Sequence, residues 1–175
     1  MDPKQTAQQR GRQGQNGRRP RKFGKNNDQA KSGLERKLVS IRRVTRSYKG
    51  GKRLRMSVLV VVGDRAGRVG VAIAKGADVK AAEEKAAKIA EKNMIKINIK
   101  GNTISHLVYH KKGAAKILLR PAAPGTGIIA GSAIRAVAEL AGIKDILSKV
   151  IGTNNKITNV YATMEALSSL IVRPK

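Results

Sequence analysis

The sequence has no cysteine and no tryptophan, and it contains one phenylalanine and three tyrosines. Without cysteine the chain can form no disulfide framework, no cysteine-ligated metal site and no cysteine nucleophile. No stretch approaches the roughly eighteen consecutive apolar residues of a membrane-spanning helix, and the polar amino terminus has no apolar core of a secretory signal. We therefore expect a cytoplasmic protein without a membrane partner.

Acidic residues are also scarce. The chain has 11 Asp and Glu against 37 Lys and Arg, a formal net charge of +26. Acid–base catalysis therefore has few carboxylates to use, and we find no catalytic set. His106 and His110 stand four residues apart with no acid or third ligand near them in the sequence, so we expect no metal site and no cofactor. A charge of this size favours a polyanionic partner.

The positive charge is concentrated near the amino terminus, where residues 1–53 hold 17 basic and 3 acidic residues. Residues 1–33 are rich in Gln, Asn and Gly and have little apolar surface besides Phe23, which predicts a disordered basic arm. Such an arm is a solvated tail, a nucleic-acid-contacting segment that orders on binding, or an organelle transit peptide. Asp2 and the low serine content disfavour the transit peptide.

Residues 34–100 have the pattern of a small domain with three strands and a helix. Period-two alternation predicts an antiparallel meander. Its strands are expected around Val39–Arg43, Leu54–Val62 and Val69–Ile73, with turns at Gly50-Gly51 and Gly63–Gly67. Asp78 is a candidate cap of the helix that follows. The apolar stripe of that helix is predicted to comprise Val79, Ala82, Ala86, Ile89 and Asn93.

Residues 101–175 predict a second α+β domain. A hairpin is expected over Ile104–Tyr109 and Ala115–Leu119, followed by a rigid loop over Pro121–Gly127. A helix over Gly131–Gly142, ended by its glycine, and a strand over Ile146–Ile151 come next. Asn155 or Thr153 is expected to cap the last helix. The buried side of that helix is predicted to hold Val160, Met164, Leu167 and Ile171.

The segment Gly125-x-Gly127-x-x-Ala130-Gly131 is similar to a dinucleotide-binding fingerprint, and Asp145 follows Gly125 by twenty residues. However, Pro121 and Pro124 break the tight strand-to-helix turn that the fingerprint needs, and no further alternation of strands and helices follows. We therefore expect no nucleotide or other small-molecule substrate. The glycines are better interpreted as allowing close backbone approach in helix packing or at a macromolecular interface.

The strongest signal is a basic hairpin around Gly50 and Gly51, with Tyr48 as its one aromatic residue. Glycines permit a tight tip, and each Lys or Arg on a phosphate displaces counterions. Proteins that bind single strands stack bases on aromatic side chains, so the scarcity of aromatics favours structured RNA. A merely solvated basic loop is the alternative. The candidate phosphate ligands are Arg42, Arg43, Arg46, Lys49, Lys52, Arg53 and Arg55.

A series of motifs runs in order over about residues 34–170. The first are Arg43-Val44, Lys49-Gly50-Gly51, Arg53, Val61–Asp64, Gly67–Gly70 and Lys75. The middle ones are Asn93-Met94, Thr103, His106, Val108, Pro121-Ala122, Gly125–Gly131, Ala133, Arg135–Val137 and Ala141-Gly142. The last are Gly152, Asn154, Asn159-Val160 and Ala162-Thr163. Together these motifs resemble the family of ribosomal protein five of the bacterial small subunit.

The chain departs from the family pattern in a few places. Ala72 and Ala74 stand where the family usually has glycine, and Lys156 stands where it usually has proline. These changes affect a turn or a cap and remove no charged contact. The basic arm is longer than usual in the family, and the resemblance implies nothing about its role.

The resemblance implies a double-stranded-RNA-binding-like domain, followed by a βαβ-type domain. It also implies a seat on small-subunit rRNA near the head–body junction and the mRNA entry region, beside ribosomal proteins four and eight, with a role in decoding accuracy. Arg68 and Lys75 join the candidate RNA-binding residues on this basis, with Gly50 and Gly51. By the same comparison, Gly125, Thr126, Gly127 and Arg135 would lie toward protein four.

Our hypothesis is therefore a structural rRNA-binding component of the bacterial-type small ribosomal subunit, and not an enzyme. A transient RNA-binding assembly module is the first alternative, and the copy number in salt-washed subunits distinguishes the two. A nucleotide-dependent enzyme with the same carboxy-terminal fold is the second alternative. It would need a complete phosphate loop and a catalytic acid, and we find neither in the sequence.

Overall fold

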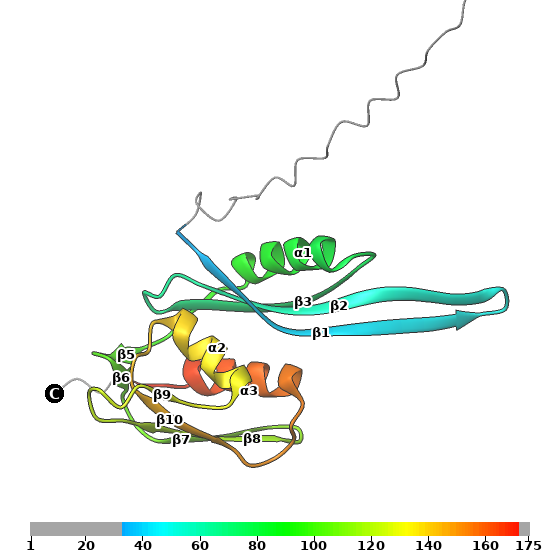
Figure 1. The fold of residues 1–175 in the computed structure, drawn as a ribbon. Helices are drawn as coiled ribbons and strands as arrows, with labels where there is room; N and C mark the ends of the chain where they lie inside the picture. Colours follow the sequence, from blue (N-terminus) through cyan, green and yellow to red (C-terminus); the bar gives the residue numbers. More distant parts are fainter. Residues whose placement is uncertain (1–32, 172–175) are drawn as a thin grey trace, which may run out of the picture.

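The computed structural model describes residues 33–171, so the predicted basic arm lies outside the described residues except for Gly33. The first part of the fold is an antiparallel sheet with the strand order β1-β2-β3-β4 (Figure 1). The strands span Glu35–Tyr48, Gly51–Gly63, Arg68–Gly76 and Ile95–Lys96. The predicted three-stranded meander is therefore confirmed, and the short β4 extends it by one strand.

Helix α1, Val79–Lys92, covers one face of this sheet. Its contact side is made of small residues, since Ala82, Ala86, Ala87 and Ala90 are fully buried, so the helix approaches the strands closely. The predicted stripe is correct at Ala82 and Ala86 but wrong at Ile89, which is 36% exposed, and at Asn93, an exposed cap. The stripe is displaced because the helix packs through its alanines, which sit closest to the sheet.

The second part of the fold is built around a four-stranded sheet with the order β7-β8-β10-β9. Strands β9 and β10 are parallel and α2 connects them, which confirms the expected βαβ unit. Gly131 and Gly142 cap α2, and Asn155 caps α3 by accepting a hydrogen bond from the Ile157 amide. The bounds are β7 Val108–Lys112, β8 Ala115–Pro121, β9 Ile128–Ile129, α2 Ser132–Ala141, β10 Ile146–Val150 and α3 Lys156–Ser168.

Two details of this part were predicted wrongly. The expected strand Ile104–Tyr109 is broken, because Ile104 pairs with Ile99 in a separate two-stranded sheet and β7 begins only at Val108. That sheet consists of β5, Ile99–Lys100, and β6, Thr103–Ile104. Helix α3 ends at Ser168, so the helical spacing no longer applies at Ile171, which is 68% exposed, and Leu170 is buried in its place.

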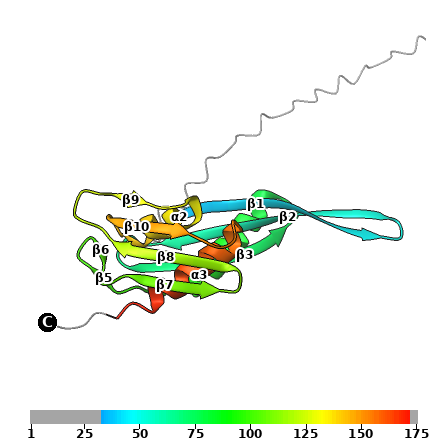
Figure 2. The ribbon, with the colours of Figure 1, turned by 90° about the horizontal axis from the view of Figure 1, so that it is seen from below.

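The two parts share one hydrophobic core, which explains the burial of β2. Val58, Val60 and Val62 face α1, whereas Leu59 and Val61 belong to the cluster formed with α2, α3 and the second sheet. Helices therefore cover both faces of the first sheet (Figures 1 and 2). Backbone hydrogen bonds join the two parts directly. The Arg65 amide donates to the Leu140 carbonyl at 3.0 Å, and the Gly67 amide donates to the Ala141 carbonyl at 3.0 Å.

Candidate nucleic-acid interface

The β1–β2 hairpin projects beyond the rest of the fold (Figure 2). In its register, Arg46 lies directly opposite Arg53, and Val44 lies opposite Arg55. Residues opposite each other in an antiparallel pair point to the same face, so all three arginines share one face. Like charges directly opposite each other are destabilising. An anion bound on this face would therefore relieve the repulsion between Arg46 and Arg53.

Lys75 joins this arginine face from β3. It pairs with Ser57, two residues beyond Arg55 on the same side of β2. The Arg46 guanidinium lies over the Tyr48 ring, 5.5 Å from the ring centre. Together these residues line a groove of about 550 Å³. The lining residues are Val44, Thr45, Arg46, Tyr48, Arg53, Arg55 and Lys75.

The opposite face and the tip are basic as well. Arg43 pairs with Met56, and Lys52 pairs with Ser47, on the face that carries α1 farther along the sheet. The turn consists of Lys49 and Gly50, whereas Gly51 is already the first residue of β2. Gly51 has φ +147°, a backbone conformation that other residues rarely adopt, and no atom lies within 4 Å of the position that a Cβ would take there. The positions that a Cβ would take at Gly50 and Gly51 are both unoccupied, so another backbone can approach the tip there.

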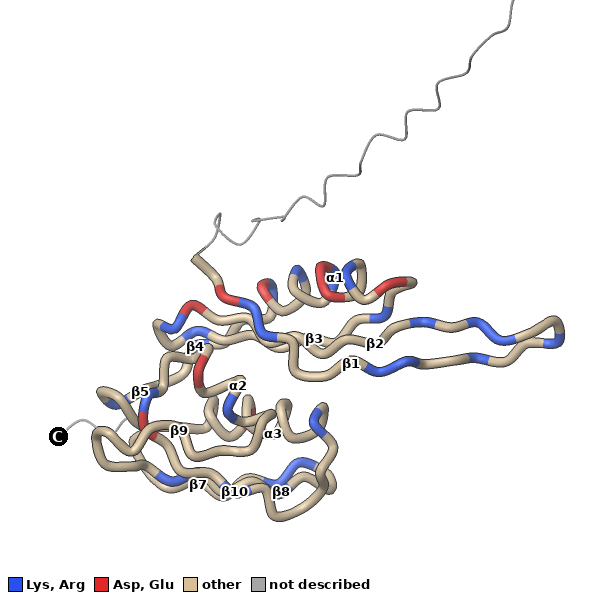
Figure 3. The backbone as a smooth tube through the Cα atoms, viewed as in Figure 1, with Lys and Arg blue, Asp and Glu red and all other residues tan. Residues whose placement is uncertain are grey.

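The projecting part of the hairpin, residues 38–57, contains no acidic residue. Figure 3 shows basic positions along the projecting part of both strands as far as the tip and no acidic position there. Within residues 33–171, the ion pairs involve none of the hairpin candidates and not Lys75. The structure thus brings together Arg46, Arg53, Arg55 and Lys75 on one face, Arg43 and Lys52 on the other, and Lys49 at the tip.

Two of the candidate residues have partners inside the protein. Arg42 donates to Asn155 Oδ1 at 3.0 Å and so links the hairpin base to the cap of α3. Arg68 lies at the other end of the sheet, because β3 runs antiparallel to β2, and its Nε is 2.6 Å from Asp64 Oδ2. The structure therefore separates Arg68 from the hairpin surface.

Asp64 organises the β2–β3 turn. Burial disfavours its ionised form, but hydrogen bonds from the Arg68 side chain and from the amides of Arg68 and Ala66 outweigh burial, so the pKa of Asp64 lies below its usual value. A carboxylate with a lowered pKa in the folded state stabilises the fold above its unfolded pKa. That stabilisation is lost as the pH falls through the folded pKa.

Asp64→Asn is expected to lower the free energy of unfolding by about 2 kcal/mol at pH 7, since bonds to a charged acceptor are lost. Asp78→Asn is the matched control, because Asp78 makes no side-chain bond at the start of α1. Urea unfolding at pH 7 and pH 3 measures both variants. The loss of unfolding free energy in Asp64→Asn should be smaller at pH 3 than at pH 7. A loss equal to that of Asp78→Asn at both pH values would contradict the role of the Asp64 carboxylate in the turn.

The loop before β9 is formed around a buried carboxylate. Asp145 is 4% exposed, and its Oδ1 accepts from the Gly125 amide at 3.1 Å and from the Gly127 amide at 2.9 Å. Thr126 folds back on the Ala123 carbonyl, and Arg135 donates to the Ile128 carbonyl at 2.8 Å. Of the four predicted protein-interface residues, Gly125, Thr126 and Gly127 therefore lie on a loop fixed by hydrogen bonds, and Arg135 lies on α2 beside it.

Other kinds of site find little support in the described part of the chain. No helix between residues 33 and 171 has the length and hydrophobicity needed to cross a bilayer. The same residues contain no group of three potential metal-ligating side chains. No acid is near His110 in the sequence, but in the fold α3 places Glu165 Oε2 3.2 Å from its Nε2. A hydrogen bond from Lys112, with a further one from His110, lowers the pKa of Glu165.

Both parts of the fold match known protein families. Residues 34–98 match the family described as ribosomal protein S5, N-terminal domain, and residues 110–171 match ribosomal protein S5, C-terminal domain. The chain belongs to the ribosomal protein S5 family. The small ribosomal subunit protein uS5 of Thermus thermophilus is 50% identical over 137 residues, which cover 78% of this chain and 85% of the relative. The uS5 proteins of two individual strains of the same species give the same values.

Membership in the S5 family confirms the resemblance found in the sequence. The chain is therefore a ribosomal protein of the small subunit, and this family consists of structural proteins of the ribosome and not of enzymes. The two matched ranges leave a gap of residues 99–109, in which the predicted domain boundary at residues 100 and 101 falls. That boundary stays a prediction, since the two parts share a core.

Sequence reasoning missed two residues that shape these surfaces. By sequence, Asp145 is connected only with the dinucleotide-like segment, although its place between Ile143 and Ile146 is a signal for a buried, hydrogen-bonded carboxylate. Glu165 was not connected with His110 because 55 residues separate them, and only the packing of α3 on β7 brings them together. Neither contact follows from local patterns.

Proposed function

We propose that this S5-family chain binds small-subunit rRNA through the arginine face and tip of its β1–β2 hairpin. The observation that carries the proposal is the cross-strand pair Arg46 and Arg53, with Arg55 and Lys75 beside it and no acid in the lining of their groove. Such a surface gains most from a partner that supplies several phosphates at fixed spacing. Tyr48 is the only aromatic residue on the hairpin, which favours RNA recognised by its backbone and shape over stacked single strands.

The proposed position is near the head–body junction and the mRNA entry region, where the chain contributes to translational accuracy. The resemblance of the Lys49–Arg53 loop to the basic loop of the family supports this position. The open glycine tip supports it too, because Gly50 and Gly51 leave room for a nucleic-acid backbone. Ribosomal proteins four and eight are the proposed neighbours. The Gly125–Gly127 loop and Arg135 are the proposed surface toward protein four.

The experiment that tests rRNA binding is chemical modification of lysines in purified small subunits and in the free protein. Lys49 and Lys52 should lose most of their reactivity toward acetic anhydride in the particle, since phosphates would cover their amines. Lys80 and Lys88, exposed on α1, serve as controls for general loss of access. Equal reactivity of Lys49 and Lys52 in the two samples would rule out the hairpin as the rRNA contact.

The proposed contact with protein four predicts a separate effect of Arg135→Glu. Arg135 is exposed on α2, away from the hairpin, so the variant should change the misreading rate in translation while its affinity for isolated rRNA stays within about twofold. Lys149→Glu makes the same charge change at an exposed position of β10 and is the control. An equal loss of rRNA affinity in Arg135→Glu would assign this residue to RNA instead.

A further inference from the structure

The outer edge of β3 lacks a strand partner over most of its length. Strand β4 pairs only with Arg68 and Val69, and none of the other described strands pairs on that side. From Val71 to Gly76 the backbone therefore presents N–H and C=O groups that could accept another strand. At about 3.3 Å per residue, this free edge is about 20 Å long.

The other edge of the sheet, β1, is protected against the addition of a further strand. Strand β1 has a bulge between Leu38 and Ser40, and it carries several Arg and Lys side chains. Bulges and edge charges are the usual means of preventing strand addition. Over Val71-Ala72-Ile73-Ala74, β3 has neither feature. This edge is therefore suited to pairing with another segment.

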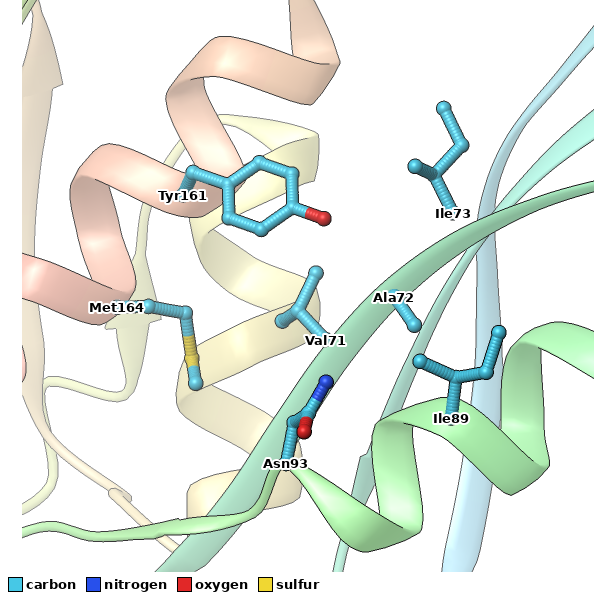
Figure 4. A pocket seen from close by; sticks show the side chains of 7 residues that line it. All are labelled: Val71, Ala72, Ile73, Ile89, Asn93, Tyr161 and Met164. Atoms are coloured by element: carbon cyan, nitrogen blue, oxygen red, sulfur yellow. The ribbon is translucent and has the colours of Figure 1, made fainter.

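An apolar groove runs beside the free edge. Its volume is about 260 Å³, and Figure 4 shows Tyr161 and Met164 of α3 on one side and Ile89 and Asn93 of α1 on the other. Ile73 is 37% exposed and Ile89 is 36% exposed, so both can contact an added chain. The two helices thus form walls above and below the position of a further strand.

The charges around the groove indicate the chemistry of its occupant. Lys85 and Lys92 lie one helical turn before and after Ile89 and are exposed on α1. Lys75 is exposed at the end of β3. Lys112 lies near Tyr161, but it already forms an ion pair with Glu165. The three lysines Lys75, Lys85 and Lys92 form no ion pair within residues 33–171.

We propose that the free edge of β3 binds an extended acidic segment of a partner protein as an added strand. Backbone hydrogen bonds along Val71–Gly76 would provide affinity, as in other cases of strand addition. Alternate side chains of the segment would point to opposite walls, with apolar ones against Tyr161 and Met164 and acidic ones toward Lys85 and Lys92. The apolar walls favour a peptide over RNA. This surface adjoins the arginine face of the hairpin and shares Lys75 with it, but the lining residues of the two grooves are different.

The test uses the full chain labelled with ¹⁵N and a synthetic nine-residue peptide that alternates valine and glutamate. Binding should slow hydrogen exchange of the outward amides of Val71–Gly76 by at least tenfold, because they become hydrogen-bonded. Two further peptides carry N-methyl groups on alternate residues, one on each edge of the strand. One of these peptides should lose binding and the other should keep it, since only one peptide edge pairs with β3.

Ile73→Lys should raise the Kd of the unmodified peptide about tenfold, because it removes an apolar contact and places a charge at the edge. Ile129→Lys, at a 53% exposed position of β9, is the control and should leave the Kd unchanged. No binding, equal binding of both methylated peptides, or perturbations confined to the hairpin would overturn the proposal. Protection of the same amides by duplex RNA in place of the peptide would overturn it as well.

Discussion

Replacement of Lys49, Lys52 and Arg53 by alanine is expected to weaken binding to small-subunit rRNA roughly 500-fold at 0.1 M salt. Each phosphate contact contributes a slope of about −0.9 in log K against log salt, so each strengthens binding about eightfold at 0.1 M relative to 1 M. The loss of three such contacts multiplies three factors of about eight, which gives roughly 500-fold. The slope itself should become flatter by about three units.

The salt dependence makes this prediction specific. At 1 M salt the variant and the unmodified chain should bind rRNA with nearly the same affinity. All three side chains are exposed, so the variant should unfold at nearly the same temperature as the unmodified chain. The control is Lys80, Lys88 and Lys92 to alanine on α1, which removes the same charge elsewhere. Equal slopes for the hairpin variant and the unmodified chain would mean that the tip faces protein or solvent.

Gly142→Ala is expected to lower the free energy of unfolding by about 3 kcal/mol or more. Gly142 has φ +88°, and an added Cβ would overlap the carbonyl oxygen of Arg65 and lie 2.7 Å from its carbonyl carbon. A left-handed conformation costs other residues about 1–2 kcal/mol, and the steric overlap adds about 1–3 kcal/mol. The substitution should therefore separate the end of α2 from the Arg65–Gly67 loop.

Gly101→Ala is the matched control for Gly142→Ala. Gly101 has φ +64°, but nothing lies within 4 Å of a Cβ there, so only the conformational cost of about 1–2 kcal/mol applies. Denaturant unfolding of both variants measures the difference. The same loss of stability in both would show that the close contact between the two parts of the fold contributes nothing.

Much of the fold could be predicted because it follows local patterns. Alternation identified β1 to β3, and glycines marked both ends of α2. The shared core was not predicted, although its signal is present in the uninterrupted apolar run Val58–Val62. A strand with one solvated face alternates, whereas a strand covered on both faces does not. The run therefore indicated helices on both sides of the sheet.

The candidate site was predictable in composition but not in arrangement. The sequence identifies the basic residues around Gly50, but the opposition of Arg46 and Arg53 depends on which two residues form the turn. Because Gly51 belongs to β2, the turn is Lys49-Gly50, and this choice fixes which side chains share a face. The internal partners of Arg42 and Arg68 depend on tertiary packing, which local patterns do not contain.

The central claim is that the chain is a constituent of the small subunit held on rRNA by its basic hairpin. Its most direct test is the copy number of the chain in small subunits washed at high salt, measured by quantitative mass spectrometry for the unmodified protein and for the Lys49, Lys52 and Arg53 variant. About one copy per particle is expected for the unmodified chain, and clearly less for the variant. Substoichiometric recovery of the unmodified chain, or equal retention of both, would contradict the claim.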